Sequence, residues 1–162
     1  MKNILIRVKS SRRTVTSLKI ISLLSSVVCA AVFCVQLLLS VLSEQYLTAI
    51  GVAASAAIGL FAVTVMRKII NAPRPYEIYD FYEQLPREKS GQSFPSRHAY
   101  SAFVIATLAW LLHPIASVSL LLIGVCLSVA RVLLGIHFIR DVAVGAALGV
   151  ISGVLGILII VI

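Results

Sequence analysis

The segment VAVGAALGVISGVLGILIIVI, residues 142–162, contains no charged side chain. A helix needs about 20 mostly apolar residues to cross the hydrocarbon core of a bilayer. Two earlier runs without charge, Ile20–Ser43 and Gln45–Met66, have a similar length. A fourth run, Ala99–Ala130, is interrupted at His113-Pro114. These runs predict membrane-spanning helices.

The composition supports the same fold class. Of the 162 residues, 60% are hydrophobic and 12% are charged, with a mean hydropathy of +1.05. A soluble domain carries about 25% charged residues. We therefore predict an all-α fold, a polytopic bundle of about five transmembrane helices that forms a single domain over residues 19–162. The five predicted spans are 19–43, 46–66, 96–113, 114–134 and 138–162.

A basic segment precedes the first predicted span. Residues 1–19 contain six basic side chains and no acidic one. Beside a transmembrane helix, such a run favours a cytoplasmic anchor on anionic lipid headgroups over nucleic-acid binding. We therefore expect residues 1–18 to be a basic N-terminal segment at the cytoplasmic face of a multi-pass cell-membrane protein. Its expected partners include membrane lipids and no nucleic acid.

Much of the remaining charge lies in the middle of the chain. Residues 67–97 contain ten of the twenty charged side chains, together with four prolines that interrupt any continuous helix. Tyrosines and a phenylalanine alternate with acidic residues there, as expected for a segment at the level of the lipid headgroups. We predict an interfacial loop over residues 67–95.

A second polar stretch, ARVLLGIHFIRDV (residues 130–142), directly precedes the last apolar run. His137 and Asp141 are four residues apart, so on a helix they would share one face. An aspartate beside a histidine fixes the imidazole tautomer and leaves the other ring nitrogen free to react. Arg131 comes shortly before Gly135, which we expect to mark the turn between the last two spans.

If the spans alternate in direction, Arg67, Arg74 and His98 reach the same membrane face as this stretch. Ionisable groups near lipid are costly, so such a cluster needs a charged partner. Arginine side chains match phosphate oxygens in bidentate pairs. The pattern therefore favours a phosphate-binding site. For other cations we expect only contact with lipid headgroups; these are Arg12, Arg13, Arg87 and Lys89.

Three motifs in order resemble those of the type 2 phosphatidic acid phosphatases, the PAP2 family. The first family motif is a basic residue, six residues and Arg-Pro; the second is Pro-Ser-Gly-His; the third ends in Arg, five residues, His, three residues and Asp. The matching residues in this chain are Arg67 with Arg74-Pro75, Phe94-Pro95-Ser96-Arg97-His98, and Arg131 with His137 and Asp141.

The resemblance implies a membrane phosphatase that uses no metal and no cofactor. His137 would attack phosphorus and form a phosphohistidine while Asp141 holds its ring. His98 would protonate the leaving oxygen and then activate water. The side chains that would bind the substrate phosphate are Arg67, Arg74, Ser96, Arg97 and Arg131. The expected substrate is a lipid phosphate or a polyprenyl phosphate or diphosphate.

The chain also departs from the family pattern. Arg67 stands where the family usually has Lys, with Lys68 as the neighbouring alternative. Arg97 replaces the family's Gly, and Ala130 replaces its Ser. Arg97 adds charge and bulk at the expected phosphate position, so the resemblance does not define which substrate this chain prefers. Family members commonly have six spans, and five are predicted here.

Two other classes of function fit parts of the pattern. A small transporter or proton relay would also carry an intramembrane His–Asp pair, and a non-catalytic lipid-phosphate-binding protein would need only the arginines. Independently, Gly145, Gly149 and Gly153 continue the row of His137 and Asp141 at helical spacing. Such a row predicts a close helix-packing face, either within the chain or between two copies of it.

Overall fold

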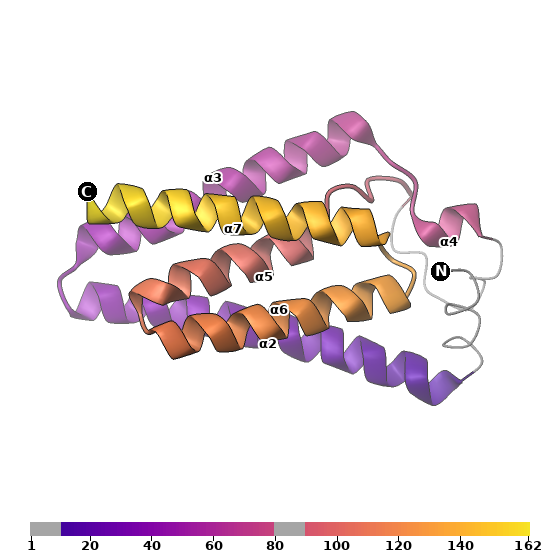
Figure 1. Ribbon diagram of the computed structural model, residues 1–162, viewed down its shortest axis with the longest axis horizontal. Helices are drawn as coiled ribbons and strands as arrows, with labels where there is room; N and C mark the ends of the chain where they lie inside the picture. The colour runs from indigo at the N-terminus through magenta and orange to yellow at the C-terminus, as the bar shows by residue number, and fades with distance from the viewer. Residues whose placement is uncertain (1–10, 80–89) are drawn as a thin grey trace.

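The structure is a computed structural model that describes residues 11–79 and 90–162. It is an elongated bundle of helices, and its described part contains no strand (Figure 1). In chain order the helices are α2 (Arg12–Leu42), α3 (Tyr46–Ile70), the short α4 (Pro75–Ile78), α5 (Arg97–Leu108), α6 (Pro114–Leu133) and α7 (Ile139–Val161). The predicted all-α membrane bundle is confirmed.

Within the described residues, four segments are long and apolar enough to cross a bilayer. They are Arg12–Leu42, Tyr46–Ile78, Pro114–Leu133 and Ile139–Val161. Many large apolar side chains on these helices are exposed, which is the arrangement expected of a surface that faces lipid.

The predicted span 96–113 is shorter in the structure than the sequence suggested. Helix α5 has 12 residues and continues only as the 3₁₀ turn η2 (Ala109–Leu111). Its side chains are buried on several faces, including Tyr100, Val104 and Leu108, because α5 packs against α2, α3, α6 and α7. A helix enclosed by other helices does not have to match the thickness of the lipid.

Local sequence signals explain where the helices begin and end. Ser11 caps α2, so the first helix includes residues 12–18 of the predicted basic segment, and residues 1–10 lie outside the described residues. His113 caps α6 through Nδ1, which accepts from the Ile115 amide at 3.2 Å, and Pro114 occupies the first turn. Gly135 has a φ of 68°, which confirms the predicted turn between α6 and α7.

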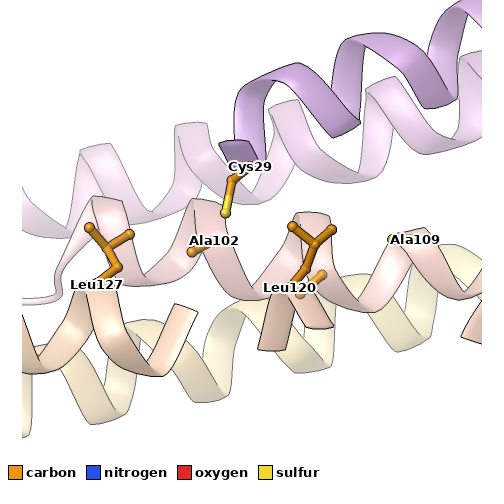
Figure 2. Close-up of a cluster of buried hydrophobic side chains, with 6 residues drawn as sticks. Cys29, Ala102, Ala109, Leu120 and Leu127 are labelled. Atoms are coloured by element: carbon orange, nitrogen blue, oxygen red, sulfur yellow. The ribbon is translucent and has the colours of Figure 1, made fainter. Parts of the chain in front are cut away.

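Small side chains allow the central helix to pack closely. Figure 2 shows Cys29 of α2 and Leu120 and Leu127 of α6 against Ala102 and Ala109. Alanine on the α5 side leaves room for the larger residues of its neighbours. This cluster fixes α5 between α2 and α6.

The glycine row of α7 makes a second close contact with α5. A Cβ atom on Gly145 would lie 2.5 Å from the Ser96 carbonyl oxygen, and one on Gly149 would lie 2.6 Å from the Tyr100 carbonyl oxygen. Gly145, Gly149 and Gly153 are all buried. Of the two arrangements considered for this row, the structure has the packing face within the chain. The row holds the start of α7 against the start of α5.

The helices alternate in direction. As Figure 1 shows, α3 and α6 end, and α5 and α7 begin, at the same end of the bundle. Helix α2 also begins at this end, whereas the C-terminus lies at the opposite end. The helix ends that carry the three motifs are therefore brought together.

Candidate active site

Asp141 lies in the first turn of α7 and is completely buried. Its Oδ2 accepts a hydrogen bond from the Phe138 amide at 2.9 Å. The first turn of a helix has amide groups without helical partners and a positive dipole end, and both stabilise a carboxylate. The helix end therefore explains how a charge is kept inside an apolar bundle.

His137 lies in the connection between α6 and α7, with 2% of its surface exposed. Its Nδ1 is 3.7 Å from Asp141 Oδ2, which is longer than a good hydrogen bond. The two side chains lie close together, but His137 precedes the first residue of α7, so the helix face that their spacing predicts is not formed. The contact between them is nevertheless not a direct hydrogen bond.

Ser93 lies between these two side chains. Its Oγ donates to Asp141 Oδ2 at 2.5 Å and lies 3.3 Å from His137 Nδ1. Ser93 is completely buried. Sequence reasoning missed this residue, because its partners are 44 and 48 positions away. The only signal is its place two residues before the Pro95 of the second motif.

Arg67, in the last turn of α3, reaches the same loop. Its Nη1 donates to the Ser93 carbonyl oxygen at 3.2 Å and to the Pro95 carbonyl oxygen at 2.5 Å. The side chain is 4% exposed. An arginine has five N–H donors, so the other nitrogens remain to bind an anion. The first motif thus positions the second.

Arg74 is held by a carboxylate that the sequence analysis did not select. Glu77 accepts from the Arg74 amide at 2.6 Å and from the Gly91 amide at 2.8 Å. The Arg74 Nε donates to the Gly91 carbonyl oxygen at 3.1 Å. Glu77 therefore connects the two sides of the segment 80–89, which lies outside the described residues. These bonds fix Arg74 in a buried position.

Ser96 begins α5 as its N-cap, and its Oγ accepts from the Ala99 amide at 3.4 Å. The Ser96 amide donates to the Asp141 carbonyl oxygen at 2.9 Å. This backbone bond joins the second motif to the third. The cap uses the hydroxyl oxygen as an acceptor and leaves its proton to be donated.

Arg97 and His98, in the first turn of α5, are exposed, and Arg131 is half-buried in the last turn of α6. All three therefore stand at the end of the bundle that carries His137. Arg140 is exposed as well, and its Nε lies 3.6 Å from Asp141 Oδ1.

The cations for which only contact with headgroups was expected fall into two groups. Arg12 and Arg13 are exposed. Arg87 and Lys89 lie outside the described residues.

The surroundings of His137 favour its neutral form. Burial lowers its pKa below the usual 6.5, and the positive charges of Arg67 and Arg74 act in the same direction. Asp141 opposes the shift only in part. The ring is therefore neutral at neutral pH, which is the form that a nucleophile requires.

Residues 11–79 and 90–162 contain no cluster of three or more His, Cys, Asp or Glu side chains that could hold a metal ion. Arginines from three helix ends and the connection after α3 provide positive charge here; they are Arg67, Arg74, Arg97 and Arg131. The arrangement thus combines a neutral imidazole with several guanidinium groups.

The chain matches the PAP2 superfamily over residues 35–161, a range that contains all three motifs. It belongs to the PAP2 superfamily. The family membership agrees with the resemblance drawn from Arg67 to Asp141.

Two solved structures show the same fold. The crystal structure of LpxE from Aquifex aeolicus has a TM-score of 0.71 and 23% identity, and the match covers 91% of this chain and 87% of that one. The first transmembrane PAP2 type phosphatidylglycerolphosphate phosphatase from Bacillus subtilis has a TM-score of 0.58 and 20% identity. That match covers 96% of this chain and 90% of the phosphatase.

A sequence relative of this PAP2 chain is the bacitracin transport permease protein BcrC of Bacillus licheniformis. The two are 30% identical over 88 residues, which is 54% of this chain and 43% of the relative. The match thus spans less than half of the relative's length.

Proposed function

We propose that this PAP2 chain is a membrane phosphatase that hydrolyses a lipid phosphate or a polyprenyl phosphate or diphosphate through a phosphohistidine. The observation that carries the proposal is the burial of a neutral His137 beside Asp141, at the end of the bundle where Arg67 and Arg74 are also buried. In this proposal the nucleophile comes from the α6–α7 connection and its phosphate ligands from the end of α3 and the start of α4.

In the first step, Nε2 of His137 attacks phosphorus in line with the leaving oxygen. The new N–P bond forms as the P–O bond to the lipid breaks, and the leaving oxygen takes a proton from His98. Because Nδ1 faces Ser93 and Asp141, Nε2 is the nitrogen available for attack.

In the second step, the neutral His98 removes a proton from water, and the water oxygen attacks the phosphohistidine. The N–P bond breaks, inorganic phosphate leaves, and both histidines return to their starting states. Arg67, Arg74 and Arg131 bind the phosphate oxygens during both steps, together with the Ser96 hydroxyl and Arg97. Their positive charge stabilises the transition state without a metal.

An apolar groove supports a lipid substrate. A cavity of about 410 Å³ lies along α5, α6 and α7, and Leu133 and Ile139 line it beside the connection that carries His137. A hydrocarbon chain in this groove would bring its phosphate to the site. A lipid phosphate also agrees with the substrate in the name of the Bacillus subtilis neighbour, phosphatidylglycerolphosphate. The proton-relay alternative has less support, because His98 and Asp141 lie at the starts of α5 and α7, which are at the same end of the bundle.

The direct test measures phosphate release by the purified chain in detergent. Phosphatidate, phosphatidylglycerol phosphate, and polyprenyl mono- and diphosphates would be compared with and without EDTA. We expect release in EDTA, a trapped acid-labile phosphoprotein, and loss of both in His137→Gln but not in the control His113→Gln. Absence of release from every substrate would contradict the proposal, and activity that depends on an added divalent ion would contradict the metal-free mechanism.

We further propose that the site faces the cytoplasm. The start of α2 and the site lie at the same end of the bundle, and the basic residues before α2 favour the cytoplasmic side. The test places a cysteine at the exposed Ser90 in a chain without Cys29, Cys34 and Cys126. In intact cells Ser90→Cys should resist an impermeant thiol reagent, whereas ready labelling would place the site outside.

A further inference from the structure

Ser93 occupies a position that the motif pattern assigns to no role. Its hydroxyl oxygen is 2.5 Å from Asp141 Oδ2 and 3.3 Å from His137 Nδ1, whereas those two atoms are 3.7 Å apart. All three side chains are buried. The shortest polar path from the carboxylate to the imidazole therefore runs through the serine.

The protons can be assigned along this path. An ionised carboxylate only accepts hydrogen bonds, so the Ser93 hydroxyl must donate its single proton to Asp141. The serine oxygen then faces His137 Nδ1 with its lone pairs, and Nδ1 must carry a proton to make the contact favourable. This arrangement leaves the lone pair of the imidazole on Nε2.

We propose that Ser93 is a positioning residue that links Asp141 to His137, with Nδ1–H donating to Ser93 Oγ and Ser93 O–H donating to Asp141 Oδ2. Its catalytic consequence rests on the proposed function, in which His137 is the nucleophile. The serine fixes the tautomer that exposes Nε2 to the substrate phosphate.

The backbone on both sides of Ser93 holds the hydroxyl in this place. The Ser93 amide donates to the Ala72 carbonyl oxygen at 2.9 Å, and its carbonyl oxygen accepts from Arg67 Nη1 at 3.2 Å. Asp141 Oδ2 is held independently by the Phe138 amide at 2.9 Å. Neither end of the path can move without breaking a buried hydrogen bond, which costs about 1–3 kcal/mol.

These contacts also connect substrate binding with the nucleophile. Arg67 touches the Ser93 carbonyl oxygen with one nitrogen and has other donors for the phosphate. A phosphate that binds to Arg67 is therefore connected, through the same guanidinium, to Ser93, which orients His137. Ser93 therefore contacts a residue of the first motif, Arg67, and a residue of the third, Asp141.

The first experiment reads the tautomer and does not depend on activity. The chain has three histidines, so ¹⁵N-labelled imidazoles of the full-length protein in detergent give a simple spectrum. We expect His137 to be protonated on Nδ1 in the wild type and to become a mixture of tautomers in Ser93→Ala. A wild-type His137 protonated on Nε2, or an unchanged spectrum in Ser93→Ala, would overturn the proposal.

The second experiment measures turnover of a lipid phosphate. Ser93→Ala should lower kcat by about 100-fold with little change in KM, because a tautomer defect acts on the chemical step. Ser93→Thr, which keeps the hydroxyl, should recover most of the loss. Ser117→Ala is the matched control, because Ser117 is a buried serine on α6 outside the site, and its kcat should be unchanged.

A double variant tests whether Ser93 acts through Asp141. If it does, adding Asp141→Asn to Ser93→Ala should cost much less than the product of the two single losses. Fully multiplicative losses, or a Ser93→Ala kcat within about twofold of the wild type, would overturn the proposal. If instead the wild type releases no phosphate from any substrate, the proposed function fails while the tautomer comparison still tests Ser93.

Discussion

Arg67 Nη1 donates to the carbonyl oxygen of Pro95 at 2.5 Å and so joins the end of α3 to the loop before α5. This position usually holds a lysine in the family. A lysine has one nitrogen with three donors, whereas arginine has a planar fork of three nitrogens. One nitrogen of the guanidinium can hold the loop while the others bind the phosphate. A substitution of Arg67 should therefore affect both the loop contact and phosphate binding.

Arg67→Lys should keep the charge and lose part of the loop contact. We expect kcat/KM to fall about tenfold, because one ammonium group cannot serve both carbonyl oxygens and the phosphate. Arg67→Ala should lose activity and also lower the Tm, because the Ser93 and Pro95 carbonyl oxygens lose a buried donor. Lys68→Ala, at an exposed neighbouring position, is the control and should behave like the wild type. An active, equally stable Arg67→Ala would contradict this role.

Glu77→Gln tests the carboxylate that connects Arg74 with Gly91. A neutral amide accepts more weakly from the two backbone amides, so Arg74 should lose its fixed position. We expect inhibition by vanadate, which mimics the transferred phosphate, to weaken about tenfold. Glu44→Gln, at an exposed acidic residue between α2 and α3, should leave vanadate inhibition unchanged. Equal inhibition of both variants and the wild type would exclude Glu77 from positioning Arg74.

The buried His137 should titrate below the usual value for histidine. Because its folded-state pKa is lowered from 6.5, the unfolded chain binds this proton more readily than the folded one. Its contribution to stability is therefore present above pH 6.5 and is lost as the pH falls through the folded-state pKa. An NMR titration of the imidazole should give a midpoint below 6.5. A midpoint at or above that value would show that the ring is not held neutral.

A bulky side chain in the groove along α5, α6 and α7 should impair the reaction of long-chain substrates more than that of short-chain ones. Ala146→Trp places a large ring in the cavity, whereas Ala147→Trp adds the same ring at an exposed position of the same helix. We expect Ala146→Trp to raise KM for long-chain phosphates and to spare a short water-soluble phosphate ester, and Ala147→Trp to change neither. Equal effects on long and short substrates would argue against a chain-binding groove.

The sequence predicts the helices well where bilayer thickness determines the length of an apolar run. It overestimates α5, because the uncharged run from Ala99 continues beyond the last residue of the helix to His113-Pro114. The spacing of His137 and Asp141 predicts their proximity but not that His137 lies in the connection before α7. The roles of Ser93 and Glu77 cannot be predicted from the sequence, because the hydrogen bonds that define them form only in the folded structure.

The glycine row illustrates the same limit. Its period predicts a packing face, but the period is identical for a contact inside the chain and for one between chains. The close approach of Gly145 to Ser96 and of Gly149 to Tyr100 identifies the partner as α5.

The enclosure of α5 has a consequence for the lipid environment. Bilayers differ in thickness, and a membrane helix adapts to this mismatch by tilting or by thinning the lipid around it. In this bundle the outer helices α2, α3, α6 and α7 meet the hydrocarbon, while the short α5 meets mainly protein. Adaptation can therefore occur at the periphery while the start of α5 keeps its register with Asp141. Such a protein is suited to work in membranes of different thickness without a change in the geometry of its reacting groups.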